Sequence, residues 1–351
     1  MIINMIQVGI VGGTGYTALE LLKLLALHPH VEVAAVTSRD ASFPRLSEVH
    51  PELNGVYDLT FELLDVDTLC ERVDLVFCCL PHAASAEIVR QLLERDVRVI
   101  DFSADYRLND VTTFEQWYGV THPDPDRVGS VVYGLPEFFR NQIESANLVA
   151  NPGCFPTSAL IPLLPLLADG LIEPDHVIVD AKTGVSGAGR KANLKFHFPE
   201  CNDSITAYSV GNHRHAPEME HLIQRVCNVD SGVTFTAHLA PMTRGILATI
   251  YVQPTSGVDV EAVQKSWQTV YEEEPFVRMV HQPPATRHVV SSNFCDIAVF
   301  SARRGLVIVA AIDNLIKGAS GAAVQNMNVM LGFQETTALL PSNGERVTSS
   351  S

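Results

Sequence analysis

A glycine-rich turn between an apolar strand and an apolar helix places the strongest constraint on how this chain can fold. The strand-like segment Ile6–Val11 runs through Gly9 into Gly12 and Gly15, and the apolar segment Leu19–His28 follows as a helix. Glycines at these positions allow a tight turn and close approach of backbone N–H groups to a phosphate, and a helix N-terminus adds a favourable dipole. The arrangement predicts a dinucleotide-binding sheet, with a glycine turn in some other α/β protein as the alternative.

Short apolar strands continue to alternate with helices after this turn. The segments Val31–Val36, Asp74–Leu80 and Val97–Asp101 are expected as buried strands, and Ala83–Glu94 is expected as a helix. This alternation is typical of a doubly wound parallel sheet, in which loops at the carboxyl ends of the strands line the ligand crevice.

The second half of the chain has strands without regular helices between them. The expected elements are strands at Val233–Ala237, Gly245–Gln253, Phe294–Val299 and Leu306–Asp313, with helices at Val260–Tyr271 and Ala322–Leu331. Such a series favours a mostly antiparallel sheet. The predicted fold class is therefore α/β: a Rossmann-type doubly wound parallel sheet plus an α+β catalytic domain with a mostly antiparallel sheet.

A chain of 351 residues is long enough for two domains. We expect a nucleotide-binding domain over residues 1–150, completed by a C-terminal helix over 315–335. A second domain, for catalysis and dimerisation, is expected over 151–314, and a polar tail over 342–351.

The bulk composition limits the partners and the compartment. A net charge of −16 argues against a general nucleic-acid surface and means that an anionic ligand needs a local cluster of basic groups. The seven cysteines, an odd number without metal-binding spacing, indicate reduced thiols. We find no signal-peptide pattern and no apolar run of membrane-spanning length. We therefore expect a cytoplasmic protein without membrane or nucleic-acid partners and without a metal.

The residues after the second strand bear on the choice of nucleotide. Where a site for NAD would carry an acid for the ribose hydroxyls, the chain has Ser38 and Arg39. A hydroxyl and a guanidinium suit a ribose 2′-phosphate, so NADP is favoured. The adjacent Asp40 weakens this preference, and a solvated loop charge is the alternative for Arg39.

A cysteine framed by turn-forming residues lies near the middle of the chain, in Asn151–Thr157. Strand, tight turn and helix would place Cys154 at a helix N-terminus, where the partial positive charge stabilises a thiolate of lowered pKa. The helix is expected over Ser158–Leu167, interrupted by Pro162 and Pro165. The alternative is a buried structural cysteine.

Two histidines and an arginine lie together just before another helix. His213, Arg214 and His215 precede Pro217, which is expected as the first helical residue. A histidine can transfer a proton at neutral pH, and Arg214 can hold a carboxylate or phosphate. Capping or surface histidines are one alternative and metal ligands another, although no cysteine or carboxylate at a suitable spacing completes a metal site.

Further basic residues lie in loops that can hold an anion. Arg107 follows a strand and either binds an anionic substrate group or pairs with Asp105 or Asp101. Lys191 ends a loop rich in glycine and hydroxyl groups that begins at Lys182, and such a loop can wrap a ligand with its N–H groups. A plain flexible loop is the alternative. Arg244 lies in a turn between two strands.

Taken together, these motifs resemble the N-acetyl-γ-glutamyl-phosphate reductase family of arginine biosynthesis, which is related to aspartate-semialdehyde dehydrogenase. The resemblance covers essentially the whole chain. Its most specific parts are Pro-Gly-Cys-Phe-Pro-Thr, ending at Thr157, and His-Arg-His-x-Pro-Glu, ending at Glu218. Phe155 stands where many members have tyrosine.

The resemblance implies NADPH-dependent reductive dephosphorylation of an acyl phosphate to a semialdehyde through a thioester on Cys154. It implies acid–base work by His213 or His215. Since side chains alternate along an extended segment, we expect one ring to face Cys154, with a preference for His215. The implied substrate-binding residues are Arg107, Lys191, Arg214 and Arg244. The implied NADP(H)-binding residues are Gly12, Thr14, Gly15, Tyr16, Ser38, Arg39, Ser186, Gly187 and Asn314.

Two other functions compete with this one. A relative in lysine biosynthesis acts on a substrate attached to an acidic carrier protein, and it would need a basic docking face that a chain of −16 is not expected to have. An NADP-sensing regulator would have no need of the nucleophile at Cys154. The resemblance implies a small-molecule substrate, N-acetyl-γ-glutamyl phosphate, and we expect a homodimer or homotetramer.

Overall fold

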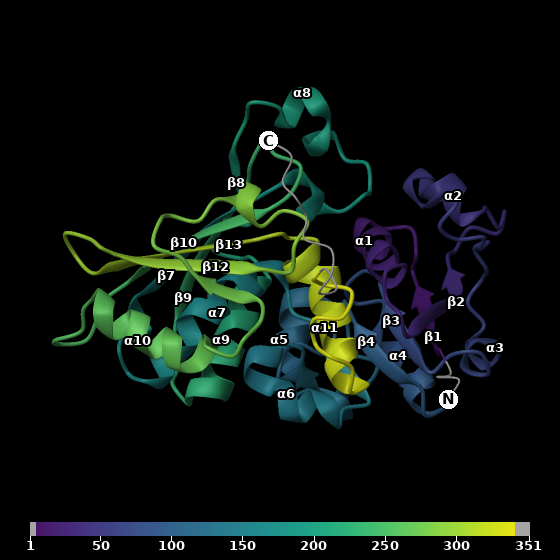
Figure 1. Cartoon of the computed structure of the whole chain (residues 1–351), viewed down its shortest axis with the longest axis horizontal. Coiled ribbons are helices and arrows are strands. Elements are labelled where there is room, and N and C mark those ends of the chain that lie inside the picture. The colour runs from purple at the N-terminus through teal and green to yellow at the C-terminus, as the bar shows by residue number, and fades with distance from the viewer. Residues whose placement is uncertain (1–4, 341–351) are drawn as a thin grey trace. The chain divides into compact units, whose positions relative to one another are not determined.

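The computed structural model describes residues 5–340, which divide into two compact units (Figure 1). The first unit contains the chain up to Tyr106, Ser130–Asn151 and the residues from Ser320 onward. The second contains Arg107–Gly129 and Pro152–Ala319. By its contacts, the stretch 107–129 thus groups with the second unit. The polar tail expected at 342–351 lies outside the described residues.

The first unit is built on a six-stranded parallel sheet of order β2-β1-β3-β4-β6-β5. Its strands are β1 Ile6–Val11, β2 Val31–Thr37, β3 Leu75–Cys78, β4 Arg98–Asp101, β5 Val132–Tyr133 and β6 Leu148–Ala150. All five pairings are parallel. The predicted doubly wound sheet is therefore confirmed. Its order reverses between β1 and β3, where such sheets bind ligands.

Helices connect these strands. They are α1 Tyr16–Leu25, α2 Leu46–Val49, α3 Val66–Cys70, α4 Ala86–Leu93, α6 Pro136–Glu144 and α11 Gly321–Met330, with a 3₁₀ turn η1 at Pro51–Leu53. The strands read as apolar runs because both faces are covered; all four residues of β3 are buried.

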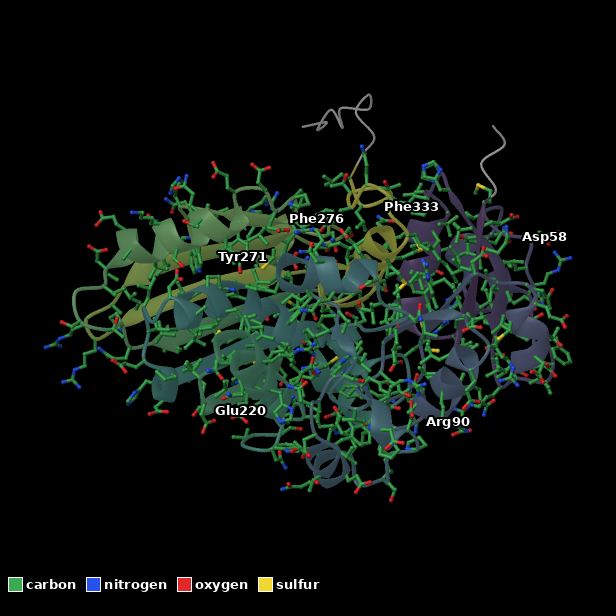
Figure 2. All side chains as sticks on the ribbon, turned by 90° about the horizontal axis from the view of Figure 1, so that it is seen from below. Asp58, Arg90, Glu220, Tyr271, Phe276 and Phe333 are labelled. Atoms are coloured by element: carbon green, nitrogen blue, oxygen red, sulfur yellow. The ribbon has the colours of Figure 1, made fainter. Side chains whose placement is uncertain are left out.

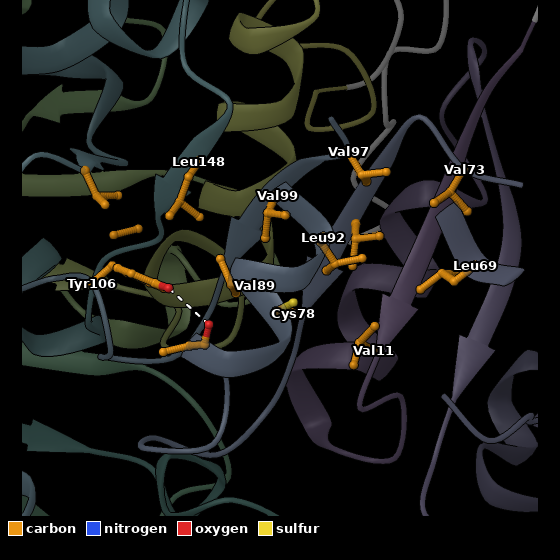
Figure 3. Close-up of a cluster of buried hydrophobic side chains, with 14 of the residues drawn as sticks. Val11, Leu69, Val73, Cys78, Val89, Leu92, Val97, Val99, Tyr106 and Leu148 are labelled. Carbon is orange, nitrogen blue, oxygen red and sulfur yellow. Dashed lines mark hydrogen bonds between the residues drawn. The ribbon is translucent and has the colours of Figure 1, made fainter. Parts of the chain in front are cut away.

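Figure 3 shows one cluster of the core of this unit. Apolar side chains of β1, β3 and β4 meet those of α3 and α4, among them Val11, Leu69 and Val99. At the edge of the cluster the Tyr106 hydroxyl donates to the Ala86 carbonyl oxygen at 3.1 Å. The polar end of the tyrosine is thus satisfied while its ring stays buried.

The C-terminal helix α11 belongs to the first unit although more than 150 residues separate it from β6. All ten of its residues are buried, and its polar side chains form hydrogen bonds. The Asn326 amide donates to the Gly134 carbonyl oxygen at 2.9 Å and to Asn151 Oδ1 at 3.1 Å. Asn328 Oδ1 lies 3.0 Å from His28 Nε2. These hydrogen bonds offset the free-energy cost of burying the polar side chains of α11.

The second unit is built on a seven-stranded sheet of order β11-β12-β13-β10-β7-β9-β8. Its strands are β7 Val177–Thr183, β8 Thr206–Tyr208, β9 Val233–Leu239, β10 Ile246–Val252, β11 Val277–Met279, β12 Cys295–Ser301 and β13 Leu306–Ile312. Four of the six pairings are antiparallel, which confirms the mostly antiparallel sheet.

Three long helices of this unit pack on one face of the sheet: α7 contacts β10 and β13, α9 contacts β9, and α10 contacts β12. The helices are α5 Val111–Tyr118, α7 Cys154–Ala168, α8 Phe198–Cys201, α9 His215–Cys227 and α10 Val260–Tyr271. Shorter turns are η2 Pro125–Arg127, η3 Pro174–His176, η4 Val185–Ala188, η5 Leu194–Phe196, η6 Thr286–His288 and the π-helical η7 Ile316–Ser320. In the described part of the chain, no helix is long and apolar enough to span a membrane.

Helix α7 corrects the expected boundaries of the central helix. It starts at Cys154 and passes through Pro162 and Pro165, so the expected interruption at these prolines was wrong. Because Pro165 has no N–H, the helix cannot form the usual bond to the Ile161 carbonyl oxygen. The hydroxyl of Tyr271, labelled in Figure 2, donates to that oxygen instead. The neighbouring helix α10 thus supplies the missing donor.

We predict that Tyr271→Phe lowers the free energy of unfolding of the second unit by about 1–3 kcal/mol, because a buried carbonyl loses its donor. In a Pro165→Ala background residue 165 regains its N–H, so Tyr271→Phe is expected to cost less than about 0.5 kcal/mol there. Urea unfolding followed by tryptophan fluorescence measures this, since the chain has two tryptophans and both Trp117 and Trp267 belong to the second unit. Equal losses in the two backgrounds would contradict the assignment.

Candidate active site

Cys154 is the first residue of α7, as the sequence predicted. Gly153 caps the helix from an extended conformation, and no side chain occupies the cap position. The Thr157 hydroxyl donates to the Gly153 carbonyl oxygen at 3.0 Å, which fixes the first turn. The N–H groups of Cys154 and Phe155 are therefore left near the sulfur at the positive end of the helix dipole.

Three polar side chains surround Gly153. A Cβ atom placed on this residue would lie 2.8 Å from His215 Nε2, 2.9 Å from Glu218 Oε2 and 3.0 Å from Arg107 Nη1. No side chain larger than hydrogen fits there without displacing one of these groups. An imidazole, a carboxylate and a guanidinium thus converge on the residue that precedes the cysteine.

Glu218 holds this arrangement together. Its Oε1 accepts a hydrogen bond from the Gly153 N–H at 2.8 Å, and its Oε2 accepts one from Arg107 Nη1 at 3.3 Å. Both side chains are buried, at 5% exposure for Arg107 and 1% for Glu218. The structure thus pairs Arg107 with Glu218, which was not among the partners expected from the sequence, Asp101 and Asp105. The sequence motif contained Glu218, but it gave no sign that Arg107 would pair with it.

Helix α9 corrects the expected geometry of the two histidines. It starts at His215, two residues before Pro217, and Arg214 already has helical dihedral angles. Because the segment turns here, the rings of His213 and His215 are not on opposite faces. Their centroids are 4.9 Å apart, and both rings meet the Phe155 ring edge to face, at 5.6 and 5.8 Å.

The two imidazoles have different surroundings. His213 Nδ1 accepts the backbone N–H of His215 at 3.1 Å, so this ring caps the N-terminus of α9. Burial, with a smaller contribution from Arg214, lowers the pKa of His213 to about 4, which leaves the ring neutral at physiological pH. His215 instead directs Nε2 toward Gly153. The geometry therefore distinguishes a capping histidine from one that faces the cysteine turn.

Two further residues near Cys154 were given no role from the sequence. A Cβ atom on Gly318 would lie 2.8 Å from the Cys154 Cβ, so only glycine fits in this turn. Tyr208 lies close enough that burial, and then Cys154, raises the pKa of its phenol. Gly318 was within a recognised motif, whereas Tyr208, on the edge strand β8, was not.

The surroundings of the Cys154 thiol disfavour the thiolate. Burial raises its pKa to about 11, and Glu218 adds to this rise. Arg107 and the N–H groups of Phe155 and Cys154 act in the opposite direction but do not outweigh burial. Burial thus opposes the low pKa that was expected from the helix N-terminus. A base is needed to take the proton.

Three loops meet at one end of the seven-stranded sheet. Asn314 Oδ1 accepts the Gly245 N–H at 2.7 Å, and its amide donates to Ser186 Oγ at 3.0 Å. Arg244 forms two contacts with the buried Asp313, at 3.0 and 3.2 Å. Ser186, Arg244 and Asn314 are thus brought together, and Gly187 shares the turn η4 with Ser186.

Two of the predicted basic residues, Lys191 and Arg214, are exposed on the surface of the second unit. Lys191 is exposed in the segment after η4. The exposed Arg214 lies with its guanidinium 5.1 Å from the ring centroid of Tyr118, in cation–π geometry.

The predicted cofactor residues Gly12, Thr14, Gly15 and Tyr16 lie at the first turn of the other unit. Gly12 has φ +87°, and a Cβ there would lie 2.8 Å from the Cys79 carbonyl oxygen. The N-terminus of α1 has no capping side chain and no acid in its first turn. These features fit a bound pyrophosphate.

The N-terminus of α4 differs, because an acid already occupies it. Both carboxylate oxygens of Asp105 accept backbone N–H groups, from Ala83 at 2.6 Å and from Ser85 and Ala86 at 3.0 Å. An anion would be repelled there, so α1 is the terminus of the two that suits a phosphate.

The residues after β2 also fit a phosphate. Arg39 is exposed and has no ion pair among the residues that the structure describes. Asp40, which weakened the sequence argument, accepts the Ser42 N–H at 2.9 Å and is thus held within its own loop. Ser38 Oγ accepts the N–H of Asp40 at 3.2 Å. Over residues 5–340, no three histidine, cysteine or acidic side chains form a group that could hold a metal.

Comparison with known families matches both halves of the chain to semialdehyde dehydrogenases. Residues 7–146 match the family described as "Semialdehyde dehydrogenase, NAD binding domain", and residues 154–314 match "Semialdehyde dehydrogenase, dimerisation domain". Solved structures share the fold. Aspartate semialdehyde dehydrogenase II from Vibrio cholerae aligns with TM-score 0.71 at 18% identity, covering 94% of this chain and 99% of that one. The enzyme with NADP from Candida albicans aligns with TM-score 0.70 at 15%, covering 93% and 99%.

Fold and site therefore define a member of the semialdehyde dehydrogenase class. Much closer relatives carry one name. The N-acetyl-γ-glutamyl-phosphate reductase of Rhodopirellula baltica is 52% identical over 95% of this chain and 98% of its own length. That of Desulforudis audaxviator is 48% identical over 96% and 98%. The chain belongs to the N-acetyl-γ-glutamyl-phosphate reductase family.

We predict that alkylation of Cys154 in the resting protein is slow at pH 7 and accelerates by about tenfold for each pH unit up to pH 10, because the thiolate is the nucleophile. Arg107→Gln is expected to slow the reaction further, since it removes a cation that favours the thiolate while the charge of Glu218 remains. Iodoacetamide labelling with mass spectrometry of the Cys154 peptide measures both. Fast alkylation at pH 7 with no pH dependence would contradict the raised pKa.

Proposed function

We propose that the protein catalyses the NADPH-dependent conversion of N-acetyl-γ-glutamyl phosphate to N-acetylglutamate 5-semialdehyde and phosphate, the third step of arginine biosynthesis from N-acetylglutamate. The observation that carries this proposal is the convergence of His215, Glu218 and Arg107 on the turn that presents Cys154. A thiol at a helix N-terminus, beside an imidazole and a guanidinium, is suited to attack an anionic acyl phosphate.

Cys154 is the nucleophile in this proposal. Its sulfur forms a bond to the acyl carbon, and the bond from that carbon to the phosphate oxygen breaks, so phosphate leaves and a thioester remains. The N–H groups at the start of α7 are placed to stabilise the negative charge on the carbonyl oxygen.

His215 is the proton carrier. It accepts the proton of the Cys154 thiol, which burial otherwise holds in place, and a protonated imidazole then donates a proton when the aldehyde forms. Glu218 and Arg107 hold Gly153 and the cysteine turn in position. His213 keeps α9 and the His215 backbone in place as a cap.

Basic residues hold the anionic groups of the substrate. Arg107, Lys191, Arg214 and Arg244 are the proposed set, because a chain of net charge −16 needs local basic groups to attract a doubly anionic substrate. Of these residues, Arg107 lies beside Gly153 and lowers the pKa of the Cys154 thiol.

The first unit provides the nucleotide site. Gly12, Thr14, Gly15 and Tyr16 would hold the pyrophosphate at α1, and Ser38 and Arg39 the ribose 2′-phosphate. In the other unit, Ser186, Gly187 and Asn314 would serve the nicotinamide end. When bound, NADPH supplies the hydride that reduces the thioester. The N-terminal nucleotide domain, with the C-terminal helix, and the catalytic domain are thus proposed as separate functional parts.

The test is phosphate-dependent reduction of NADP by N-acetylglutamate semialdehyde, the reverse reaction. Wild type is expected to be active, and Cys154→Ser to lose at least about 10³-fold in kcat. His215→Asn is expected to lose about 10²- to 10⁴-fold.

His213→Asn is the matched control, because it removes the neighbouring ring and a helix cap. It is expected to cost mainly stability, about 0.5–2 kcal/mol. A fully active Cys154→Ser would contradict the mechanism. A larger kcat loss in His213→Asn than in His215→Asn would reverse the roles assigned to the two histidines. Turnover only with aspartate semialdehyde or a carrier-linked substrate would move the protein to a sister activity.

We further propose that the second unit forms a homodimer through the face of its sheet opposite the helices. Ile178 and Tyr251, a cross-strand pair, are 46% and 44% exposed on that face. Beside them Asp180 pairs with Lys182 and His238, so this patch is nearly neutral in an acidic protein. The family description of residues 154–314 as a dimerisation domain favours a second copy as the partner.

Tyr251→Glu is expected to shift the protein from dimer toward monomer in analytical ultracentrifugation, because a two-fold interface brings two such charges together. Leu27→Glu is the control, since Leu27 is 72% exposed in the first unit. An unchanged mass for Tyr251→Glu would exclude this face as the interface.

A further inference from the structure

Asp313 lies at the end of β13 and is the hub of the three-loop cluster. Its side chain is fully buried. Oδ1 accepts the backbone N–H groups of Leu315 and Ile316, at 2.8 and 3.2 Å, and Oδ2 accepts that of Ser291 at 2.7 Å. The same two oxygens receive Arg244, with Nε at 3.0 Å from Oδ2 and Nη2 at 3.2 Å from Oδ1.

This carboxylate has no acceptor capacity left for a substrate. Two carboxylate oxygens offer about four lone-pair sites, and four N–H hydrogen bonds already use them, with Arg244 Nε as a further ionic contact. Asp313 therefore cannot bind or protonate a reacting group itself. Its effect on the reaction must pass through the groups that it holds.

The guanidinium of Arg244 is the first of those groups. A guanidinium presents two edges, each able to hold two oxygens, and Asp313 takes the edge formed by Nε and Nη2. The Arg244 side chain is 17% exposed, whereas Asp313 is fully buried. The ion pair thus fixes the plane of a guanidinium that is partly accessible to solvent. A flexible arginine would instead lose conformational entropy when it bound an anion.

The turn after β13 is the second group. The Asp313 carbonyl oxygen accepts the Gly318 N–H at 2.9 Å, and the Gly318 backbone packs against Cys154. One residue therefore fixes both an arginine and the wall against which the cysteine packs.

We infer that Asp313 is a positioning residue that orients Arg244 toward an anionic group of the substrate. Through the turn at Gly318, it also fixes Arg244 relative to Cys154. The inference rests on the proposed function, in which Arg244 binds a phosphate or carboxylate. Asp313 is not among the residues proposed to bind the substrate, bind the cofactor or transfer a proton. Its role as a positioning residue explains how an arginine in an ion pair can still bind an anion.

The test compares Asp313→Asn, Arg244→Ala and the double variant in the reverse reaction. Asp313→Asn is expected to raise the KM for the semialdehyde or for phosphate about tenfold, with a smaller change in kcat and less than about a twofold change in the KM for NADP. In the Arg244→Ala background the same substitution is expected to add less than about twofold, since Asp313 acts through Arg244.

Asp296→Asn is the matched control. It breaks a similar pair, in which Arg278 contacts the buried Asp296 at 2.6 and 3.0 Å on β12, in the same sheet. It is expected to lower the unfolding temperature without changing any KM. KM values equal to wild type in Asp313→Asn, or losses that multiply fully in the double variant, would overturn the inference.

A second measurement is independent of turnover and of the Asp313 variants folding. Inorganic phosphate is expected to protect Cys154 of the wild type from alkylation, and Arg244→Lys is expected to raise the half-protecting concentration about tenfold, because lysine keeps the charge but not the oriented edge. Equal protection in Arg244→Lys would overturn the inference even if the wild type showed no reductase activity. An inactive wild type with the expected protection pattern would instead reject the proposed function alone.

Discussion

The rest of the site depends on the buried Glu218 carboxylate, which binds both the Gly153 N–H and the Arg107 guanidinium. A buried carboxylate is tolerated only where donors satisfy it, and here a backbone N–H and a guanidinium supply them. In return, the carboxylate fixes the start of α7, and so the position of Cys154, relative to α9. The chemistry of the cysteine is thus tied to a residue 64 positions further along the chain.

The same carboxylate shapes the electrostatics. Burial and the charge of Glu218 both disfavour the thiolate, while Arg107 favours it. In the proposed mechanism, the imidazole of His215 would therefore have to take the proton from the thiol before the sulfur attacks. Arg107 and Arg244 are held in the same way. Each pairs with a buried acid that fixes its guanidinium, one beside Cys154 and one at the end of β13.

Sequence reasoning succeeded where local chemistry decides structure. The glycine turn before α1, the position of Cys154 at a helix N-terminus and the two kinds of sheet followed from turn residues and apolar periodicity. It failed where a distant group intervened and where a helix boundary was misplaced. Pro165 does not interrupt α7, because Tyr271 from another helix replaces the lost donor. The two histidine rings are not on opposite faces, because α9 starts at His215 and not at Pro217.

What the sequence determined by itself is therefore the fold class, the cysteine and the set of residues from which a site can be built, since these depend on short-range patterns. The tertiary structure decided the pairing within that set. Arg107 meets Glu218, His215 faces the turn before Cys154, and Gly318 packs on Cys154. These choices depend on contacts between residues far apart in the chain, which no local pattern encodes. Burial, which sets the pKa of Cys154, exists only once those contacts have formed.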